Sequence, residues 1–187
     1  MTPQQSIRTP RLRLVAATVP MAKAAADGDL AAFSQLLDAH VPPEWPPEIM
    51  ADAQGPLVEQ LKTAQSGTGS LAWYITLIDK KLLVGFAGFK GTPRDGRIDI
   101  GYAILDAHQK QGYATEAVNV LSHFAFMDPR VQRVVGETLP GLTASIRVME
   151  KCGYTLVGTD VPGHDGEESV VQYELKREQL FGDADEK

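Results

Sequence analysis

Residues 101–118, with the sequence GYAILDAHQKQGYATEAV, decide how the chain is interpreted. The alternating residues before this segment predict a strand, and the apolar residues that follow it at helical spacing predict an amphipathic helix. Between the two, Gly112 and Ala114 stand where larger side chains would block a close approach to the backbone. Several N–H groups at the start of the helix can therefore face a phosphate group. Taken alone, the two residues have a simpler explanation, in which Gly112 starts the helix and Ala114 packs on a sheet.

The residues before this segment predict strands and helices in succession. Alternation of polar and apolar residues indicates a strand, and alanine- and leucine-rich stretches favour a helix. The strands expected at 71–79, 81–90 and 97–105 are joined by short turns and should form an antiparallel meander. The expected elements are a strand at 11–15, a helix over 21–37 interrupted at 27–29, a helix at about 55–65, and strands at 71–79, 81–90 and 97–105.

The residues after the meander change to a helical period. A helix follows from 114 to 125, and Asp128 with Pro129 ends it. A second helix has Thr143 as its expected N-cap and Gly153 as its left-handed stop. The remaining elements are a strand at 133–139, that second helix over 143–152, and strands at 154–159 and 169–176. The order predicts an α/β (α+β) fold, with a mixed, mostly antiparallel central sheet flanked by helices on both faces.

The composition is that of one globular domain. The chain has 187 residues, 43% of them hydrophobic and 22% charged, enough for one packed core. We therefore expect a single domain over 1–187, with a core at about 9–176 and a frayed tail at 182–187. No apolar run approaches the about 18–20 residues that cross a bilayer, and no signal segment is present, so a cytoplasmic protein without a membrane partner is expected.

Charge and cysteine content narrow the partners further. The net charge of −6 and the lack of a lysine- or arginine-rich run argue against nucleic acid as a partner. Cys152 is the only cysteine, and no zinc-like spacing of cysteines and histidines occurs, so no metal is expected. Cys152 stands beside a predicted helix end with no local sign of activation, which predicts a buried structural thiol.

Two motifs resemble those of one enzyme family. Gln109, Gly112 and Ala114, followed by a helix that contains 115–117 (TEA), resemble the acetyl-coenzyme A motif of the GNAT superfamily of N-acetyltransferases. Residues 140–154 (PGLTASIRVMEKCGY) are similar to that family's later helix, in the form typical of its ribosomal-protein N-terminal acetyltransferase (RimJ/RimL) branch. The opening 9–14 (TPRLRL) also resembles the first strand of that branch, so the likeness runs from about 9 to 176.

The resemblance implies where the coenzyme binds. In such folds the fourth and fifth strands, here 97–105 and 133–139, splay apart, and the pantetheine arm lies along the exposed backbone of the fourth. The phosphates meet the turn that follows that strand. The coenzyme-binding residues implied in this way are Ala103, Ile104, Leu105, Gln109, Lys110, Gln111, Gly112, Tyr113, Ala114, Thr115 and Ser145.

Candidate residues for the chemistry are fewer. Glu137 matches a position where some relatives place a glutamate that accepts a proton from the amine; the alternative is a solvated glutamate at a strand end. Trp45, in the proline-rich loop 40–47 (HVPPEWPP), could line an acceptor pocket or simply pack. The sequence also departs from the family, because Leu142 replaces an asparagine and Met149 stands where some relatives carry a catalytic tyrosine.

The function implied is acetyl-coenzyme A-dependent N-acetyl transfer by direct attack of a primary amine. The acceptor is a peptide N-terminus or a small-molecule amine, and the sequence does not choose between them. The alternative is a catalytically degenerate acyl-coenzyme A-binding module, which Leu142 and Met149 keep open. The oligomeric state is also open, with a homodimer as one option.

Overall fold

The structure is a computed structural model that describes residues 5–50, 53–64, 72–162 and 169–182. Its contacts divide the chain into two compact units. The first unit contains Met1–Gly88 and Tyr102–Ala117, and the second contains Phe89–Gly101 and Val118–Lys187. The chain therefore passes between the units three times, within a strand, a second strand and a helix.

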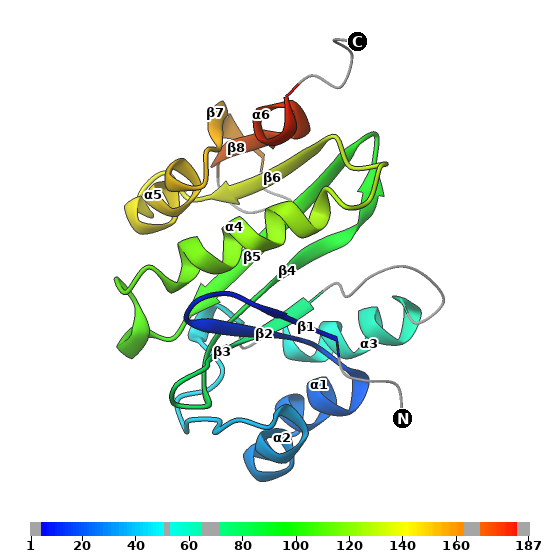
Figure 1. Ribbon diagram of the computed structural model, residues 1–187, viewed down its shortest axis with the longest axis vertical. Coiled ribbons are helices and arrows are strands. Elements are labelled where there is room, and N and C mark those ends of the chain that lie inside the picture. Colours follow the sequence, from blue (N-terminus) through cyan, green and yellow to red (C-terminus); the bar gives the residue numbers. More distant parts are fainter. Residues whose placement is uncertain (1–4, 51–52, 65–71, 163–168, 183–187) are drawn as a thin grey trace. The chain divides into compact units, whose positions relative to one another are not determined.

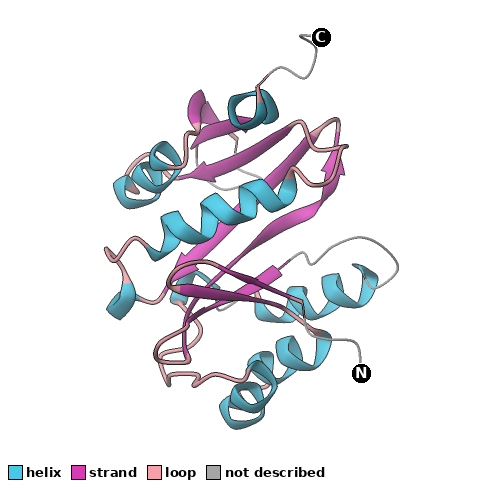
Figure 2. Ribbon diagram, in the orientation of Figure 1, coloured by secondary structure: helices cyan, strands magenta, loops and turns pink. Residues whose placement is uncertain are grey.

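Figure 1 labels the described elements along the chain, and Figure 2 distinguishes helices from strands. The strands are β1 (Ser6–Arg8), β2 (Leu12–Ala16), β3 (Ala72–Leu77), β4 (Leu82–Arg94), β5 (Arg97–Ile104), β6 (Arg133–Thr138), β7 (Thr155–Val161) and β8 (Val170–Lys176). The α-helices are α1 (Val19–Ala26), α2 (Leu30–Leu37), α3 (Gln54–Ala64), α4 (Tyr113–Ala125), α5 (Thr143–Lys151) and α6 (Arg177–Phe181), and the 3-10 helices are η1 (Glu48–Met50) and η2 (Asp106–His108).

The described strands are hydrogen-bonded in the order β1-β2-β3-β4-β5-β6-β8-β7. The pairs β1–β2, β2–β3 and β3–β4 are antiparallel, as are β6–β8 and β7–β8. Strands β5 and β6 are parallel. The sheet is therefore mixed and mostly antiparallel, which confirms the predicted α/β fold class.

The first unit has a core of its own, built from α1, α2 and α3 with β2, β3 and β4. Tyr74 of β3 is fully buried at its centre, and the rings of Phe33 and Phe86 contact it edge-on at 4.8 and 5.6 Å between centroids. Aromatic rings in this geometry add to the stabilisation that burial provides. Further members of the core are Val15, Met21, Leu37, Trp45, Leu57, Leu61, Leu83 and Leu105.

Local sequence explains why the predicted break at 27–29 separates two helices. Thr18 caps α1, because its side chain accepts a hydrogen bond from the Met21 N–H. Gly28 then takes a left-handed conformation (φ 71°) with open space around it, and Asp29 caps α2 through the Ala32 N–H. Helix α2 ends at Asp38, which is also left-handed.

The second unit contains the parallel pair of strands. The pairing of β5 with β6 runs from Arg97 opposite Arg133 to Ile100 opposite Gly136 and ends there, before β6 itself ends. Helix α5 packs against β6 through Met149, which is 1% exposed. A Cβ at Gly136 would collide with the Met149 sulfur, so the glycine is what allows this close packing.

Most predicted elements are confirmed within one to four residues of their ends. The prediction of Thr143 as a helix cap is wrong: Leu142 is the N-cap, without a side-chain hydrogen bond, and Thr143 is the first helical residue. Strand β1 and helix α6 were not expected, because three and five residues are too short to show a period. The single-domain interpretation stays a prediction, and the tail beyond 182 lies outside the described residues.

Candidate functional site

The turn before α4 lies where the sequence predicts a phosphate-binding segment. It contains two left-handed residues, Lys110 (φ 60°) and Gly112 (φ 80°). The side chain of Gln109 closes the loop that leads into it, donating from Nε2 to the Ile104 carbonyl at 3.1 Å and to Asp106 Oδ1 at 2.7 Å. The side chain of Gln109 thus ties the loop before α4 to the end of β5.

The backbone N–H groups of this turn, over 110–114, donate to no residue in the described part of the chain. The first N–H groups of any helix lack partners inside the helix, and left-handed residues beside them turn further N–H groups the same way. N–H groups at the positive end of a helix dipole favour an anion. A coenzyme pyrophosphate fits this chemistry.

The end of β5 is approached closely by β4. A Cβ at Gly85 would lie 2.5 Å from the Ala103 carbonyl oxygen, so only glycine fits at this point of β4. The Leu105 N–H donates to the Val84 carbonyl at 2.9 Å. Of the three residues expected to contact the pantetheine arm, Leu105 therefore has its N–H engaged within the protein, while its side chain lies in the core.

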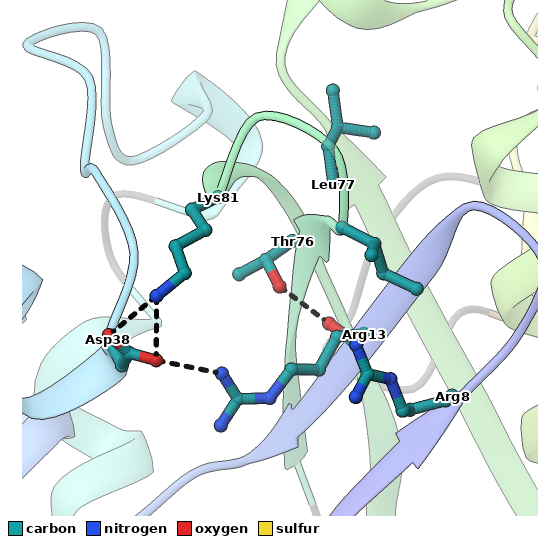
Figure 3. Close-up of a pocket in the computed structure, with 7 residues that line it drawn as sticks. Arg8, Arg13, Asp38, Thr76, Leu77 and Lys81 are labelled. Atoms are coloured by element: carbon teal, nitrogen blue, oxygen red, sulfur yellow. Dashed lines mark hydrogen bonds and ion pairs between the residues drawn. The ribbon is translucent and has the colours of Figure 1, made fainter.

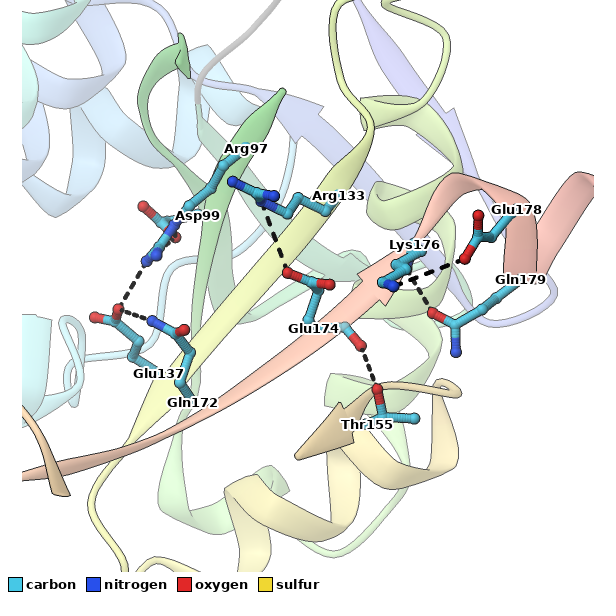
Figure 4. Close-up of polar contacts among 10 residues, drawn as sticks. All are labelled: Arg97, Asp99, Arg133, Glu137, Thr155, Gln172, Glu174, Lys176, Glu178 and Gln179. Atoms are coloured by element: carbon cyan, nitrogen blue, oxygen red, sulfur yellow. Dashed lines mark hydrogen bonds and ion pairs between the residues drawn. The ribbon is translucent and has the colours of Figure 1, made fainter. Parts of the chain in front are cut away.

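The second candidate residue, Glu137, lies in the other unit at the first position beyond the parallel pairing. Its Oε1 accepts hydrogen bonds from Arg97 Nη2 at 2.8 Å and from Gln172 Nε2 at 3.0 Å (Figure 4). The side chain of Glu137 is 10% exposed. Arg97 also contacts Asp99 Oδ1 at 2.7 Å. Glu137 is therefore a partly buried, ion-paired carboxylate, and the solvated glutamate considered as its alternative does not fit.

The charge on Arg97 is permanent. Burial alone would lower the pKa of this guanidinium, but the hydrogen bonds and charges of Asp99 and Glu137 outweigh burial and raise the pKa. An arginine beside a carboxylate favours the ionised form of that carboxylate. The hydrogen bonds from Arg97 and Gln172 thus fix the orientation of the Glu137 carboxylate.

Comparison with known proteins decides the family. A family model described as the acetyltransferase (GNAT) domain matches residues 20–155, which is more than half of the chain. The chain belongs to the GNAT acetyltransferase family. The resemblance drawn from the two motifs is confirmed, and with it the interpretation of the chain as an acetyltransferase.

Individual relatives of this GNAT protein agree. An uncharacterized N-acetyltransferase of Bacillus subtilis (strain 168), YjdG, is 31% identical over 152 residues, which are 80% of this chain and 89% of the relative. Among solved structures, the ribosomal L7/L12 α-N-protein acetyltransferase RimL in complex with coenzyme A has a TM-score of 0.64 at 19% identity, covering 92% of this chain and 98% of that one. The microcin C7 self-immunity acetyltransferase, in complex with acetyl-CoA and AMP, has a TM-score of 0.61 at 17% identity, covering 90% and 93%.

The later GNAT motif lies on α5 and forms packing contacts. Met149, at the position of a catalytic tyrosine in some relatives, is buried against Gly136. Ser145 is half-buried in the first turn of the helix, and Leu142 leaves the helix without a side-chain cap. Burial raises the pKa of the Cys152 thiol to about 11, against a hydrogen bond with the Asn119 backbone that lowers it. The expected burial of this thiol is confirmed.

Trp45 belongs to the core of the first unit. It is 5% exposed and contacts the rings of Phe33 and Tyr74 at 6.0 and 5.9 Å between centroids. The prolines of its loop do not leave the Trp45 ring exposed to solvent. These contacts favour the packing interpretation over a wall of an acceptor pocket.

A small hollow in the first unit, of about 60 Å³, is lined by Arg8, Arg13, Asp38, Thr76, Leu77, Ile78 and Lys81. Asp38 lies between two of its cations, 3.2 Å from Lys81 Nζ and 3.5 Å from an Arg13 nitrogen (Figure 3). Asp38 is thus paired with two of the three cations that line the hollow, and we assign no ligand to it.

Searches of the described residues for other kinds of site give two results. They contain no group of three or more His, Cys, Asp or Glu side chains arranged to hold a metal ion. Within the same residues, no helix has the length and apolar character that would let it cross a membrane.

Two features of the site were missed by the sequence analysis. Gly85 lies 18 positions before Ala103, and nothing in its own surroundings signals that a strand will press against it. Arg11 donates from Nη1 to the Gln111 carbonyl at 2.8 Å, although 100 positions separate the two residues. The available signal was that the opening motif at 9–14 and the turn motif at 109–114 both resemble the same family, so a contact between them could have been expected.

Proposed function

We propose that this chain transfers the acetyl group of acetyl-coenzyme A to a primary amine. The proposal rests on the backbone N–H groups of 110–114, which donate a hydrogen bond to no described residue. Membership of the GNAT family supports acetyl transfer in general. The N–H groups of 110–114 are the groups proposed to bind the pyrophosphate of the donor. RimL and the microcin C7 immunity enzyme, which share the fold, were solved with coenzyme A and acetyl-CoA.

The residues proposed to hold the coenzyme fall into two groups. Backbone N–H groups of Lys110 to Ala114 receive the pyrophosphate, and Gly112 supplies both the left-handed conformation and the space. The end of β5 at Ala103 and Ile104 receives the pantetheine arm. Because the Leu105 N–H already donates to Val84, the N–H of Ile104 is the donor proposed to polarise the reacting carbonyl. Thr115 and Ser145 remain secondary candidates.

The donor supplies an acetyl thioester, whose carbonyl carbon an uncharged amine attacks as the carbon–sulfur bond breaks and the thiolate leaves. Glu137 is the proposed acceptor of the amine's proton, directly or through water. Arg97 and Gln172 hold its carboxylate in one orientation. Met149 cannot donate a proton, so the departing thiolate, with a reference pKa of about 8.5, takes its proton from solvent.

The ion pair of Glu137 favours one class of acceptor. A carboxylate held by an arginine accepts a proton less readily than a solitary one. An α-amino group, with a reference pKa of about 7.8, loses its proton more easily than a lysine side chain at about 10.4. We therefore propose a peptide N-terminus or another amine of similarly low pKa as the acceptor, in preference to a lysine-like amine. RimL is described as an α-N-protein acetyltransferase, which is in keeping with this proposal.

The experiment that tests the proposed function is mass spectrometry of amines incubated with the protein and acetyl-CoA. Peptides with a free N-terminus and no lysine are compared with N-terminally blocked peptides that contain lysine, and with small amines. A mass increase of one acetyl group on the free N-terminus supports the proposal. Coenzyme binding without transfer to any amine would instead support the alternative, a catalytically degenerate acyl-coenzyme A-binding module.

A further inference from the structure

The turn between β1 and β2 is hydrogen-bonded to the start of α4. Thr9 Oγ1 donates to Glu116 Oε1 at 2.6 Å, and the Arg11 backbone N–H donates to the same oxygen at 2.9 Å. Arg11 Nε donates to Glu116 Oε2 at 2.7 Å. We call these three residues the N-terminal clamp. Both carboxylate oxygens of Glu116 are thus engaged by residues more than 100 positions away.

The clamp is more than a surface ion pair. The side chain of Glu116 is 15% exposed, whereas that of Arg11 is 49% exposed. Burial would raise the pKa of Glu116, but the hydrogen bonds from Thr9 and Arg11 outweigh it and lower the pKa below 4.5. A carboxylate that stays ionised and accepts several hydrogen bonds holds the guanidinium in one place, which an exposed pair does not do.

Another nitrogen of the Arg11 guanidinium contacts the turn at 110–114, which we call the coenzyme turn. Arg11 Nη1 donates to the Gln111 carbonyl at 2.8 Å. The carbonyl of Gln111 and the N–H of Gly112 belong to one planar trans peptide, so they point in opposite directions. Holding the carbonyl toward Arg11 therefore aims the Gly112 N–H away from Arg11, and this N–H is one of those that have no acceptor among the described residues.

Gly112 completes the fit. A Cβ at this position would lie 3.3 Å from Arg11 Nη2, so the missing side chain leaves the guanidinium its place. The guanidinium carbon also lies 4.8 Å from the ring centre of Tyr113, a distance at which a cation and an aromatic ring attract each other. Arg11 thus contacts three successive residues, Gln111 to Tyr113, at the tightest point of the turn.

We propose that Arg11 is a positioning residue for coenzyme binding, which orients the Gln111–Gly112 peptide so that its N–H is ready for the pyrophosphate. This inference rests on the proposed function, because it requires the pyrophosphate to bind this turn. Arg11 acts through the backbone and need not touch the coenzyme. The opening segment of the chain then forms part of the donor site.

The test compares Arg11→Gln with Arg13→Gln. Arg13 is a matched control, because it is the next arginine on the same hairpin and its guanidinium is ion-paired to Asp38 instead. Each variant is assayed with acetyl-CoA and with S-acetylpantetheine, which has the same thioester arm but no pyrophosphate. For Arg11→Gln, KM for acetyl-CoA should rise about tenfold, as expected for one lost charge-assisted hydrogen bond. Its kcat, and KM for S-acetylpantetheine, should stay at the parent values, and Arg13→Gln should change neither donor's KM.

A rise in KM for both donors would overturn the inference, because it would mark Arg11 as a support for the fold alone. An unchanged KM for acetyl-CoA would overturn it as well. Thr9→Val provides a second variant should Arg11→Gln fold poorly: it loosens the far end of the clamp, and KM for acetyl-CoA alone should rise about threefold. Should the parent transfer no acetyl group, the proposed function fails, while calorimetric affinities for coenzyme A and pantetheine still measure the same split.

Discussion

The coenzyme turn and the cluster around Glu137 differ in how their polar groups are paired. The turn at 110–114 leaves a row of backbone N–H groups without acceptors among the described residues. The Glu137 cluster instead pairs its charges within the protein, through Arg97, Asp99 and Gln172. Unpaired donors are available to a ligand's negative charge, whereas a paired carboxylate keeps its position and exchanges a proton. The difference is what the proposed roles require, since the turn is proposed to bind an anion and Glu137 to act from one fixed position.

The two regions also differ in what builds them. The turn depends on backbone conformation, above all on the left-handed Gly112, and a single motif in the sequence encodes it. The cluster depends on side chains from β5, β6 and β8, which adjacent pairing brings to one face. Substitutions in the two regions should therefore produce different changes, in affinity at the turn and in rate or stability around the cluster.

The largest expected effect concerns the packing beneath the cluster. Met149→Ala removes a buried side chain next to Gly136 and should lower the free energy of unfolding by about 3 kcal/mol. Urea denaturation measures the change, and Met127→Ala, at a methionine that is 77% exposed, is the matched control. Acetyl transfer should persist wherever the variant is folded. Loss of transfer in folded protein would give Met149 a role in the chemistry that the account denies it.

The next effect concerns the proton acceptor itself. Glu137→Gln keeps the shape but removes the base, and kcat should fall about 100-fold at neutral pH. The fall should shrink at higher pH, because more of the amine then arrives without its proton. Glu174→Gln is the control, since Glu174 lies on the neighbouring β8, is 15% exposed, and pairs with Arg133. Superimposable pH–rate profiles for Glu137→Gln and the parent would assign the proton to solvent or to another group.

A smaller effect is expected at the turn. Gly112→Leu places a side chain against Arg11 Nη2 and strains a left-handed backbone, and affinity for coenzyme A should fall about tenfold. Gly28→Leu is matched in backbone conformation (φ 71°) but has open space around it and lies between α1 and α2. Calorimetry should find its affinity unchanged. Equal affinities for the two variants would remove the turn from the coenzyme site.

The smallest effect is a pH dependence of the clamp. A carboxyl group whose pKa is lowered by folding stabilises the folded state above its unfolded pKa, and this contribution is lost as the pH falls through the folded pKa. The pKa of Glu116 is lowered from 4.5, so the difference in unfolding free energy between the parent and Glu116→Gln should be full at pH 7 and should shrink below pH 4.5. Denaturation at a series of pH values measures it. A difference that grows with acidity would reverse the assigned sign.

Sequence patterns predicted the regular elements well, because helix and strand periods are local properties. The break between α1 and α2 and the left-handed Gly153 followed from the residues that make them. Short-range chemistry also misled at one place, where Thr143 had the preferred capping side chain but the chain entered the helix one residue earlier, at Leu142. Element ends depend on the tertiary path, which a capping preference of about 1 kcal/mol does not override.

Partners brought together by the fold were harder to predict. The turn was recognised from its own residues, but its contact with Arg11 joins segments 100 positions apart. Glu137 was selected by its place in a family motif, and its pairing with Arg97 and Gln172 depends on strand registers that no single strand encodes. The sequence left Trp45 between an acceptor pocket and plain packing, and the fold buries its large apolar ring in the core.

The central claim is that the N–H groups of 110–114 receive the coenzyme's pyrophosphate, and amide hydrogen exchange measures it most directly. In the free protein these amides should exchange fast, while those within the paired strand β6 exchange slowly. Adding coenzyme A should slow exchange at 110–114, and adding pantetheine, which lacks the pyrophosphate, should leave these amides unchanged. Coenzyme A that binds and protects other residues while exchange at 110–114 stays fast would contradict the account.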